Sequence, residues 1–455
     1  MFKKILVANR GEIALRVIRA CRELGIVSVA VYSEADEASL HLKLADESVC
    51  IGPAISTKSY LNIESIINAA TTTGADAVHP GYGYLAEKAE FAKACAERDI
   101  VFIGPTPDNL KLAGDKISAK NIMEKAGVPV IPSSPGGITR LEQALGICRE
   151  IGYPVMIKAS GGGGGRGIRV CTNEEILCED FPIAKAEAAA AFGNDELYVE
   201  KFIQEPRHIE FQILADHFGN IAHLGERECT IQRRYQKLIE ESPSPRLTPE
   251  LRKAMGAAAI RVAAAVDYFN AGTVEFLLDR HGNFYFMEVN ARIQVEHPVT
   301  ELTTGIDLVK EQIRLSSGGK LDYTFDDINK RGWAIECRIN AEDPERDFLP
   351  SPGTVAEYHP PGGYGVRLDT HLYQGYELPI FYDSLIAKLV TFDLTRDGAI
   401  SIMRRALDEY IISPLKTTMP LYRQVMDDPD FCNGDFDTGF IKKYVPDDDD
   451  DEDDD

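Results

Sequence analysis

The sequence predicts a chain of α/β and α+β class, with a parallel sheet at its N-terminal end. Three observations predict this class. Strand and helix patterns alternate through the first third, a glycine-rich loop lies between two strand patterns near residue 160, and short apolar runs separated by turns follow residue 208. Alternating strands and helices are typical of parallel sheets, whereas closely spaced strands are typical of antiparallel ones.

The first third contains five predicted strands. The apolar run at residues 5–8 predicts the first, and residues 11–24 place Ile13, Val17, Cys21 and Leu24 on one helical face. The other strands are predicted over residues 27–32, 48–51, 75–79 and 100–104, with helices near 62–71 and 86–97. Turn residues 80–83 and 104–105 follow strand ends, and this is the edge at which open α/β sheets bind ligands.

The rest of the chain divides at a segment rich in Pro, Gly and Ser, residues 130–137. A smaller unit follows it, with strands at 155–158, 168–170 and 197–202 and a helix before the last strand. From residue 208 the pattern indicates antiparallel strands, with an Ala-rich helix over 248–268. Residues 330–445 mix strands and helices.

Composition excludes several classes of protein. The 455 residues carry a formal net charge of −23, and the nine acidic residues 447–455 account for only part of it. A chain this acidic does not suit the binding of nucleic acid, which requires clustered Lys and Arg. No stretch approaches the roughly 20 apolar residues of a membrane span, and no signal-peptide core follows Met1. We therefore expect a cytoplasmic protein with no membrane partner and a disordered acidic tail at 447–455.

The nine cysteines are scattered and include no C-x-x-C pair. Neither a zinc site nor a disulfide framework is predicted. Cys229 lies in a polar stretch, and we expect it to have a structural role.

The glycine loop is the strongest local signal. Five consecutive glycines follow Lys158-Ala159-Ser160, and Arg166 and Gly167 follow them. A G-x-G-x-x-G spacing is present, but a strand pattern follows it instead of a helix, and no G-K-[ST] occurs, so neither a dinucleotide-binding turn nor a Walker loop is indicated. The pattern favours a flap over nucleotide phosphates; a flexible linker is the alternative.

Two glutamates form a second candidate site. Glu275 and Glu288 lie on strand patterns joined by a turn at residues 279–283. A turn centred on His281 and Gly282 would place the two glutamates opposite each other, where like charges repel. A bound Mg²⁺ would resolve the repulsion, and Asn290 and Arg292 would share the face of Glu288. The alternative is a pair of solvent-facing acids.

A stretch dense in charged residues, 226–237, is a third candidate site. Lys237, or the pair Arg233 and Arg234, could bind a small anion. A solvated face is the equally weighted alternative.

Six blocks of the sequence together resemble biotin carboxylase, an ATP-grasp enzyme. They are residues 5–14, 79–87, 158–169, 229–237, 288–301 and 336–344, and the resemblance extends over residues 2–444. It implies a Rossmann-like N-terminal domain at 1–130, an ATP-grasp lid at 131–203, and a C-terminal domain at 204–446 that completes the ATP-grasp fold and adds a mixed part.

The resemblance also implies a reaction. Bicarbonate attacks the γ-phosphate of ATP, with Mg²⁺ or Mn²⁺ bound, and the resulting carboxyphosphate supplies CO₂ to biotin. No Met-Lys-Met attachment motif is present, so the implied biotin is carried by a separate carrier protein. A carboxyltransferase on another chain would select the final acceptor, which is acetyl-CoA, propionyl-CoA, pyruvate or 2-oxoglutarate. A homodimer is implied, with Arg19, Glu23 and Arg367 in its surface.

Site residues carried over from the resemblance fall into three groups. Those implied to hold ATP are Lys116, Lys158, Gly164, Gly165, Arg166, Glu200, Lys201, Ile203, His208, Gln232, Tyr235 and Leu277. Those implied to bind metal are Glu275, Glu288 and Asn290. Those implied to bind or act on bicarbonate and biotin are Tyr82, Lys237, Arg292, Gln294, Val295, Glu296 as the base, and Arg338 beside the biotin enolate.

The sequence departs from the family pattern at three positions. Tyr235 replaces a usual His, Ala291 a usual Thr or Pro, and Lys88 a common Asn. Two other functions are kept open. Another ATP-grasp ligase acting on an amine would keep the metal ligands but would not need Arg338, and a non-catalytic nucleotide-binding subunit would have lost the metal or base residues.

Overall fold

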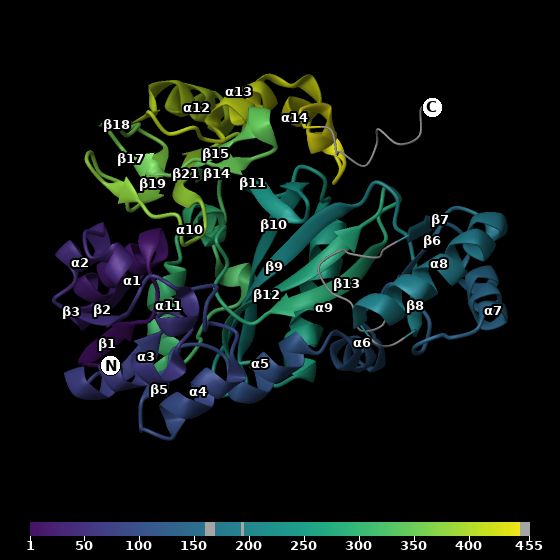
Figure 1. Cartoon of the computed structure of the whole chain (residues 1–455), viewed down its shortest axis with the longest axis horizontal. Coiled ribbons are helices and arrows are strands. Elements are labelled where there is room, and N and C mark those ends of the chain that lie inside the picture. The colour runs from purple at the N-terminus through teal and green to yellow at the C-terminus, as the bar shows by residue number, and fades with distance from the viewer. Residues whose placement is uncertain (160–168, 193–194, 446–455) are drawn as a thin grey trace. The chain divides into compact units, whose positions relative to one another are not determined.

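The computed structural model describes residues 1–159, 169–192 and 195–445 (Figure 1). The chain forms two compact units. The first comprises Met1–Val128, Arg207–Phe276 and the chain from Glu288 onward, and the second comprises Pro129–Pro206 and Leu277–Met287. Within the described residues, no helix is long and apolar enough to cross a bilayer.

The N-terminal part is built on a five-stranded sheet, as the sequence predicts. Its order is β3-β2-β1-β4-β5, and every pair is parallel. Its strands are β1 (Lys4–Val7), β2 (Val27–Ser33), β3 (Glu47–Gly52), β4 (Ala77–His79) and β5 (Val101–Phe102). Its helices are α1 (Gly11–Glu23), α2 (Leu40–Leu44), α3 (Ile63–Thr73), α4 (Ala89–Ala96), α5 (Pro107–Gly114) and α6 (Lys116–Lys125). The parallel sheet and the three predicted helices are confirmed.

The loops after β1 and β4 meet at the carboxyl edge of this sheet. Asn9 Nδ2 donates hydrogen bonds of 2.7 Å to the carbonyls of both Pro80 and Tyr82. Gly81, at φ +63°, packs so closely that an added Cβ would lie 2.9 Å from the Asn9 amide. The turn at residues 80–83 is therefore fixed against the N-terminal loop.

A second sheet of eight strands carries most of the site. Its order is β13-β12-β9-β10-β11-β14-β21-β19, and the neighbouring strands from β9 through β19 in this order pair antiparallel, as predicted from residue 208 onward. Its strands are β9 (Arg207–Ala215), β10 (Ile221–Arg233), β11 (Gln236–Ser242), β12 (Asn270–Leu278), β13 (Phe284–Asn290), β14 (Trp333–Asn340), β19 (Val366–Thr370) and β21 (Leu385–Asp393).

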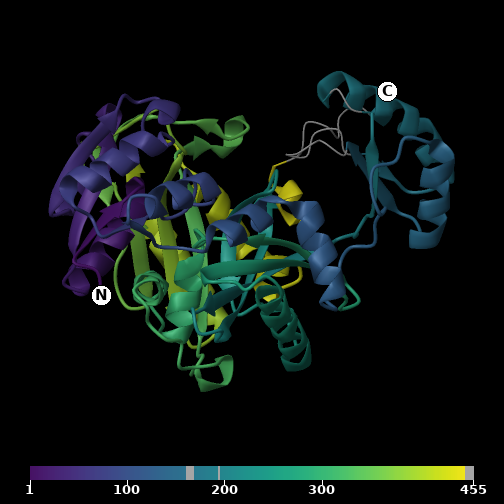
Figure 2. The same ribbon diagram turned by 90° about the horizontal axis from the view of Figure 1, so that it is seen from below.

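Helices pack on this sheet. The predicted Ala-rich helix is α9 (Pro249–Ala265), which lies against β9 and β10 (Figure 2). The short helix α10 (His297–Thr304) contacts β10, β11, β14 and β21, and α11 (Leu308–Ser316) packs against α1. Pro298 in the first turn of α10 suits a helix start, because its missing N–H would have no intrahelical partner there. Glu296 therefore ends a loop whose exit is fixed by a buried helix.

The C-terminal part mixes short strands and helices, as predicted. The strands are β15 (Glu342–Asp343), β16 (Leu349–Pro350), β17 (Gly353–Thr354), β18 (Glu357–His359), β20 (Glu377–Leu378) and β22 (Ile411–Ser413). The helices are α12 (Arg396–Glu409), α13 (Met419–Asp427) and α14 (Pro429–Asn433). Their apolar side chains form one core with β11, β14 and β21.

The second unit has a three-stranded sheet of order β7-β6-β8. Its elements are β6 (Val155–Ala159), β7 (Arg169–Cys171), β8 (Leu197–Lys201), α7 (Leu141–Ile151) and α8 (Glu174–Phe192). The predicted strands are confirmed, but the glycine loop and the acidic tail lie outside the described residues. The implied lid, residues 131–203, falls within this unit, and the domain boundaries stay predictions.

Candidate active site

Lys237 is the centre of a buried cluster of carboxylates. Its Nζ lies 2.6 Å from Glu210 Oε2, 2.9 Å from Glu275 Oε1 and 2.7 Å from Glu296 Oε1. These acids come from β9, β12 and the loop before α10. Burial opposes a charged lysine, but the three carboxylates outweigh it and raise the pKa of Lys237 well above its usual range. Lys237 is therefore a fixed cation, able to hold an anion.

Glu296 lies between two cations. Its Oε1 accepts from Lys237, and its Oε2 lies 2.9 Å from Arg338 Nη2. The side chain is fully buried. Burial acts to raise the pKa of Glu296, yet the positive charges of Lys237 and Arg338 hold it below the usual range. Glu296 is therefore an ionised carboxylate, as a proton acceptor must be.

Arg338 is held in place through both its side chain and its backbone. Its Nε donates a 2.5 Å hydrogen bond to Glu240 Oε1 on β11, and its carbonyl accepts from Tyr422 Oη at 2.6 Å. The guanidinium faces the same cluster as Lys237, since both contact Glu296. A permanent charge is thus positioned beside the base.

The segment from Asn290 to Glu296 follows the edge of this cluster. Arg292 Nη2 donates to Asn290 Oδ1 at 3.1 Å, and Arg292 also donates to Gln294 Oε1. Gln294 Nε2 then donates to Glu275 Oε1 at 3.1 Å. Lys388 Nζ holds the carbonyl of Val295 at 3.0 Å. The residues implied to bind bicarbonate are therefore brought together with Glu275 and Glu296.

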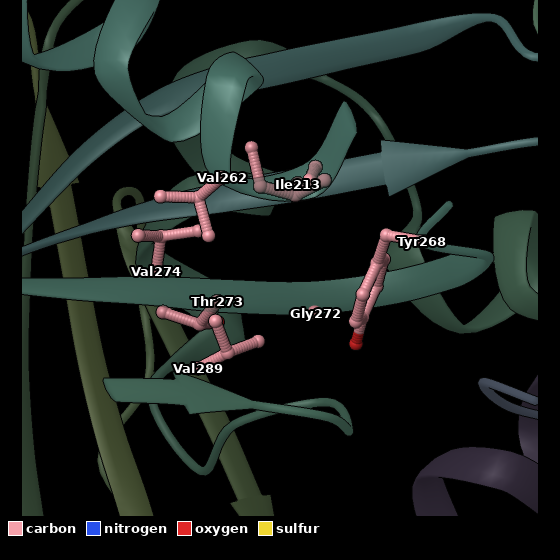
Figure 3. Close-up of a pocket in the computed structure, with 8 residues that line it drawn as sticks. Ile213, Val262, Tyr268, Gly272, Thr273, Val274 and Val289 are labelled. Carbon is pink, nitrogen blue, oxygen red and sulfur yellow. The ribbon is translucent and has the colours of Figure 1, made fainter. Parts of the chain in front are cut away.

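Glu275 and Glu288 lie on neighbouring strands of the sheet. Their neighbours Val274 and Val289 both line a small apolar cavity beside α9, together with Ile213 and Val262 (Figure 3). Because side chains alternate along a strand, Glu275 and Glu288 face away from this cavity. A turn at residues 279–283 is confirmed, with Gly282 at φ +89°, but Asp279 N bonds Asn283 O, so the turn centres on His281 and not between His281 and Gly282 as predicted. The exact pairing of the two glutamates stays a prediction.

The donors around Glu275 fit a hard divalent cation. Glu275, Glu288 and Asn290 supply carboxylate and amide oxygens, which Mg²⁺ prefers. His208 Nε2 lies 2.9 Å from Glu275 Oε2, and one donor atom each of His208, Glu210 and Glu275 lies within 4.8 Å of the other two. Lys237 and His208 hold the pKa of Glu275 well below its usual range against the effect of burial. Glu275 is therefore ionised, as a metal-binding carboxylate must be.

Comparison with known proteins places these residues in a family. The model of the biotin carboxylase N-terminal domain matches residues 1–110, and that of the biotin carboxylase C-terminal domain matches residues 336–443. Between them, residues 115–324 match the ATP-binding domain of the carbamoyl-phosphate synthase L chain. A biotin carboxylase of Nostoc is 56% identical over 442 residues, covering 97% of this chain and 99% of that protein. The chain belongs to the biotin carboxylase family.

Other relatives agree. A pyruvate carboxylase subunit of Methanothermobacter thermautotrophicus is 54% identical, over 98% of this chain and 90% of that protein. The biotin carboxylase domain of a thermophilic 2-oxoglutarate carboxylase, solved with bicarbonate, superposes with a TM-score of 0.94 at 50% identity, covering 98% of both chains. The biotin carboxylase of Campylobacter jejuni superposes with a TM-score of 0.90 at 49% identity, covering 97% of this chain and 99% of that one. Fold class and family are thereby both confirmed.

Several other residues predicted for a biotin carboxylase site belong to the second unit. In the second unit, Lys158 Nζ bonds Glu200 Oε2 at 2.8 Å, while Lys201 Nζ bonds the carbonyls of Gly152 and Tyr153. Leu277 and Ile203 also belong to that unit. Gly164, Gly165 and Arg166 lie outside the described residues. Their roles toward ATP stay predictions.

Four further predicted residues belong to the first unit. Lys116 begins α6. Gln232 pairs with Lys237 across β10 and β11. Tyr235, in the turn between these strands, is 79% exposed and has φ +63°. Tyr82 donates to Glu12, which in turn lies 3.2 Å from Lys388.

Sequence reasoning missed several buried charges of this biotin carboxylase site. Glu210, Glu240, Glu336 and Lys388 are fully buried, and so is Arg227, which binds Glu210. One signal was available in the sequence. Polar residues alternate with apolar ones in I-E-F-Q-I at 209–213 and I-E-C-R-I at 335–339, which is typical of a strand with one polar face. A polar face on two such strands indicates a site when the strands are central to the sheet.

Proposed function

We propose that the chain catalyses the ATP- and bicarbonate-dependent carboxylation of biotin held on a separate carrier protein. The observation that carries this proposal is the ionised Glu296, fixed between Lys237 and Arg338. A base between an anion-binding lysine and a permanent cation suits a reaction that deprotonates one anion and then stabilises another. Family membership supports the same reaction and the ligase class.

In the first step, Lys237 and Arg292 bind and orient bicarbonate, with Gln294 and Val295 beside it. Glu296 accepts the hydroxyl proton, and the oxygen that loses this proton attacks the γ-phosphorus of ATP as the bond to ADP breaks. Removing the proton raises the nucleophilicity of a weak nucleophile. The products are carboxyphosphate and ADP, with the proton on Glu296.

A bound Mg²⁺ would neutralise charge on the transferring phosphate, and Glu275, Glu288 and Asn290 would hold it. Lys116, Lys158, Glu200, Lys201 and the other predicted nucleotide residues would bind ATP. Carboxyphosphate is short-lived in water, so a lid over the site is needed to exclude solvent. We assign that role to residues 131–203.

In the second step, the C–O bond between the carboxyl and phosphoryl groups of carboxyphosphate breaks and releases CO₂ and phosphate. The phosphate takes the N–H proton of the biotin ureido group, and the ureido nitrogen then forms a bond to the carbon of CO₂. Arg338 stabilises the enolate form of biotin, because a guanidinium keeps its charge at any working pH. Tyr82 contributes to the biotin side of the site. Arg338 therefore serves the second step and Glu296 the first.

The partners follow from this reaction. We propose a biotin carboxyl carrier protein and a carboxyltransferase on other chains, and a homodimer of this chain, which the solved biotin carboxylase dimer of Hydrogenobacter thermophilus supports. Relatives belong to pyruvate and 2-oxoglutarate carboxylases, so the final acceptor depends on the partner. We keep the prediction of a cytoplasmic location, although some relatives are chloroplastic.

The proposed reaction predicts a specific pattern of substrate dependence. The purified chain should release ADP only when ATP, Mg²⁺ and bicarbonate are all present, and free biotin should become carboxylated in the same mixture. ADP release by a coupled assay and capture of labelled bicarbonate in carboxybiotin measure the two steps. An amine-dependent ATPase that ignores bicarbonate would instead indicate another ATP-grasp ligase.

Glu288→Gln should abolish carboxylation while the fold is retained. The variant loses a charged oxygen ligand of Mg²⁺ but also relieves repulsion from Glu275, so its thermal stability without metal should not fall. Initial rates over a Mg²⁺ titration, with circular dichroism as a check on folding, test this. Glu409→Gln, in a surface pair with Arg405, is the control. A wild-type rate at saturating Mg²⁺ would contradict the metal assignment.

A further inference from the structure

Two buried carboxyl groups face each other directly beside Arg338. In the antiparallel pairing of β11 and β14, Glu240 is the partner of Glu336. Directly paired residues share a face and have Cβ atoms about 5 Å apart. Both side chains are fully buried. Like charges at this separation repel each other, and in a buried site they repel strongly.

The hydrogen bonds of this pair are incomplete. Arg338 Nε binds Glu240 Oε1, but within the described residues neither Glu240 Oε2 nor either oxygen of Glu336 has a hydrogen-bond partner. Buried ionised carboxylates are normally paired or bonded. If the two groups shared one proton, Glu336 could donate a hydrogen bond and Glu240 Oε2 could accept it.

The surrounding charges do not neutralise a second anion. The titratable and charged groups that face Glu336 are Glu240 from β11, Arg338 on its own strand, Lys388 from β21, Glu296 before α10, and Tyr82 with Glu12 from the N-terminal part. Lys388 is bound by Val295 O and Glu12, and Arg338 already serves Glu240 and Glu296. Among these described residues, no cation donates a hydrogen bond to Glu336, and the charge of Lys388 does not outweigh the effect of burial.

We propose that Glu240 and Glu336 form a carboxyl dyad that holds one proton during catalysis, and that this proton preserves the positive charge which Arg338 offers to biotin. Burial raises the pKa of Glu336 well above its usual range, and burial raises the pKa of Glu240 to about 7. The two titrate as a pair. When the proton leaves, a second anion next to Arg338 cancels the charge that would stabilise the enolate. Glu240 and Glu336 are thus positioning residues of the second step, an inference that rests on the proposed function.

The first test does not require activity. The unfolded carboxyl groups ionise near pH 4.3, whereas the folded dyad keeps its proton to higher pH. Wild-type stability should therefore fall as pH rises from the unfolded pKa through that of the folded dyad. Glu336→Gln removes this loss, so its Tm relative to wild type should rise by roughly 2 °C or more from pH 6 to pH 9. A Tm difference that stays constant would overturn the shared proton.

The second test concerns the biotin step. In wild type, the ratio of carboxybiotin formed to ADP released should fall about tenfold for each pH unit above the titration of the dyad. Glu336→Gln should keep this ratio level from pH 7 to pH 9, whereas the surface control Glu409→Gln should follow wild type. The same alkaline fall in Glu336→Gln and wild type would overturn the role toward Arg338.

A second variant covers the case in which Glu336→Gln does not fold. Glu240→Gln also leaves one carboxyl, so it should lose the same dependence of Tm on pH, and retention of that dependence would overturn the dyad. If wild type forms no carboxybiotin at any pH, the proposed function fails. The Tm measurements still decide whether the dyad holds a proton.

Discussion

Glu296→Gln is expected to lower bicarbonate-dependent ADP release and carboxybiotin formation together, each by about 10²–10⁴-fold. Glutamine keeps the shape of the side chain but cannot accept the bicarbonate proton. Without that transfer, carboxyphosphate does not form, and the biotin step has no substrate. Lys237 keeps Glu210 and Glu275 as partners, so the anion site is retained. Parallel assays of the two products at saturating substrates measure both losses.

The control separates catalysis from ion pairing. Glu296 also binds Lys237 and Arg338, so a purely structural role would appear as a lower Tm with bicarbonate-dependent ADP release intact. Glu296→Asp keeps a carboxylate on a shorter side chain and should recover part of both activities. An ADP release rate equal to that of wild type in folded Glu296→Gln would rule out Glu296 as the base.

Arg338→Gln is expected to lower carboxybiotin formation by about 10²–10³-fold, the effect of one preorganised charge at a developing anion. Its bicarbonate-dependent ADP release should fall far less. Arg338 touches Glu296 at 2.9 Å, but Glu296 keeps the 2.7 Å contact with Lys237. The pKa of Glu296 should rise when one of its two cations is lost, so the assay is best run near pH 8, where the carboxylate remains ionised.

The ratio of the two products is the decisive quantity for Arg338→Gln. A drop in carboxybiotin relative to ADP means that carboxyphosphate is formed but breaks down without carboxylating biotin. Equal losses of both products would show that Arg338 serves bicarbonate or the fold, and its role toward the enolate would be withdrawn. Arg338→Lys is a useful companion, because it restores a charge but not the planar contact with Glu240 and Glu296.

The parallel sheet could be predicted from the sequence because the pattern that indicates each strand and helix lies within a short stretch of consecutive residues. Each strand is a short apolar run followed by a helix with a periodic apolar face, as in residues 5–24. The short helix α2 was not predicted, since it has only five residues, too few for a periodic pattern. Strand β4 begins at Ala77, two residues later than predicted. The N–H of Ala75 still bonds the carbonyl of Ala70 at the end of α3, and Asp76 connects this helix end to the strand.

The candidate site could be predicted only where its residues lie in recognisable blocks. Lys237 contacts carboxylates that are 27, 38 and 59 residues away in the sequence, and no spacing rule relates such distant positions. The opposition of Glu240 and Glu336 depends on the register of two strands almost a hundred residues apart, and a slip of one residue would turn Glu336 to the other face of the sheet. Family resemblance supplied most of the remaining site residues, but not this pair.

Lys388 joins parts of the chain that the ribosome makes at very different times. Its ammonium group ties Glu12, near the start, to the carbonyl of Val295. A nascent chain that has reached only residue 300 already contains Lys237, Glu275 and Glu296, yet it lacks the group that fixes the turn before the base. We therefore expect the bicarbonate segment to acquire its final conformation only during the last stage of synthesis. A partly synthesised chain, which lacks a complete biotin site, would then hydrolyse little ATP.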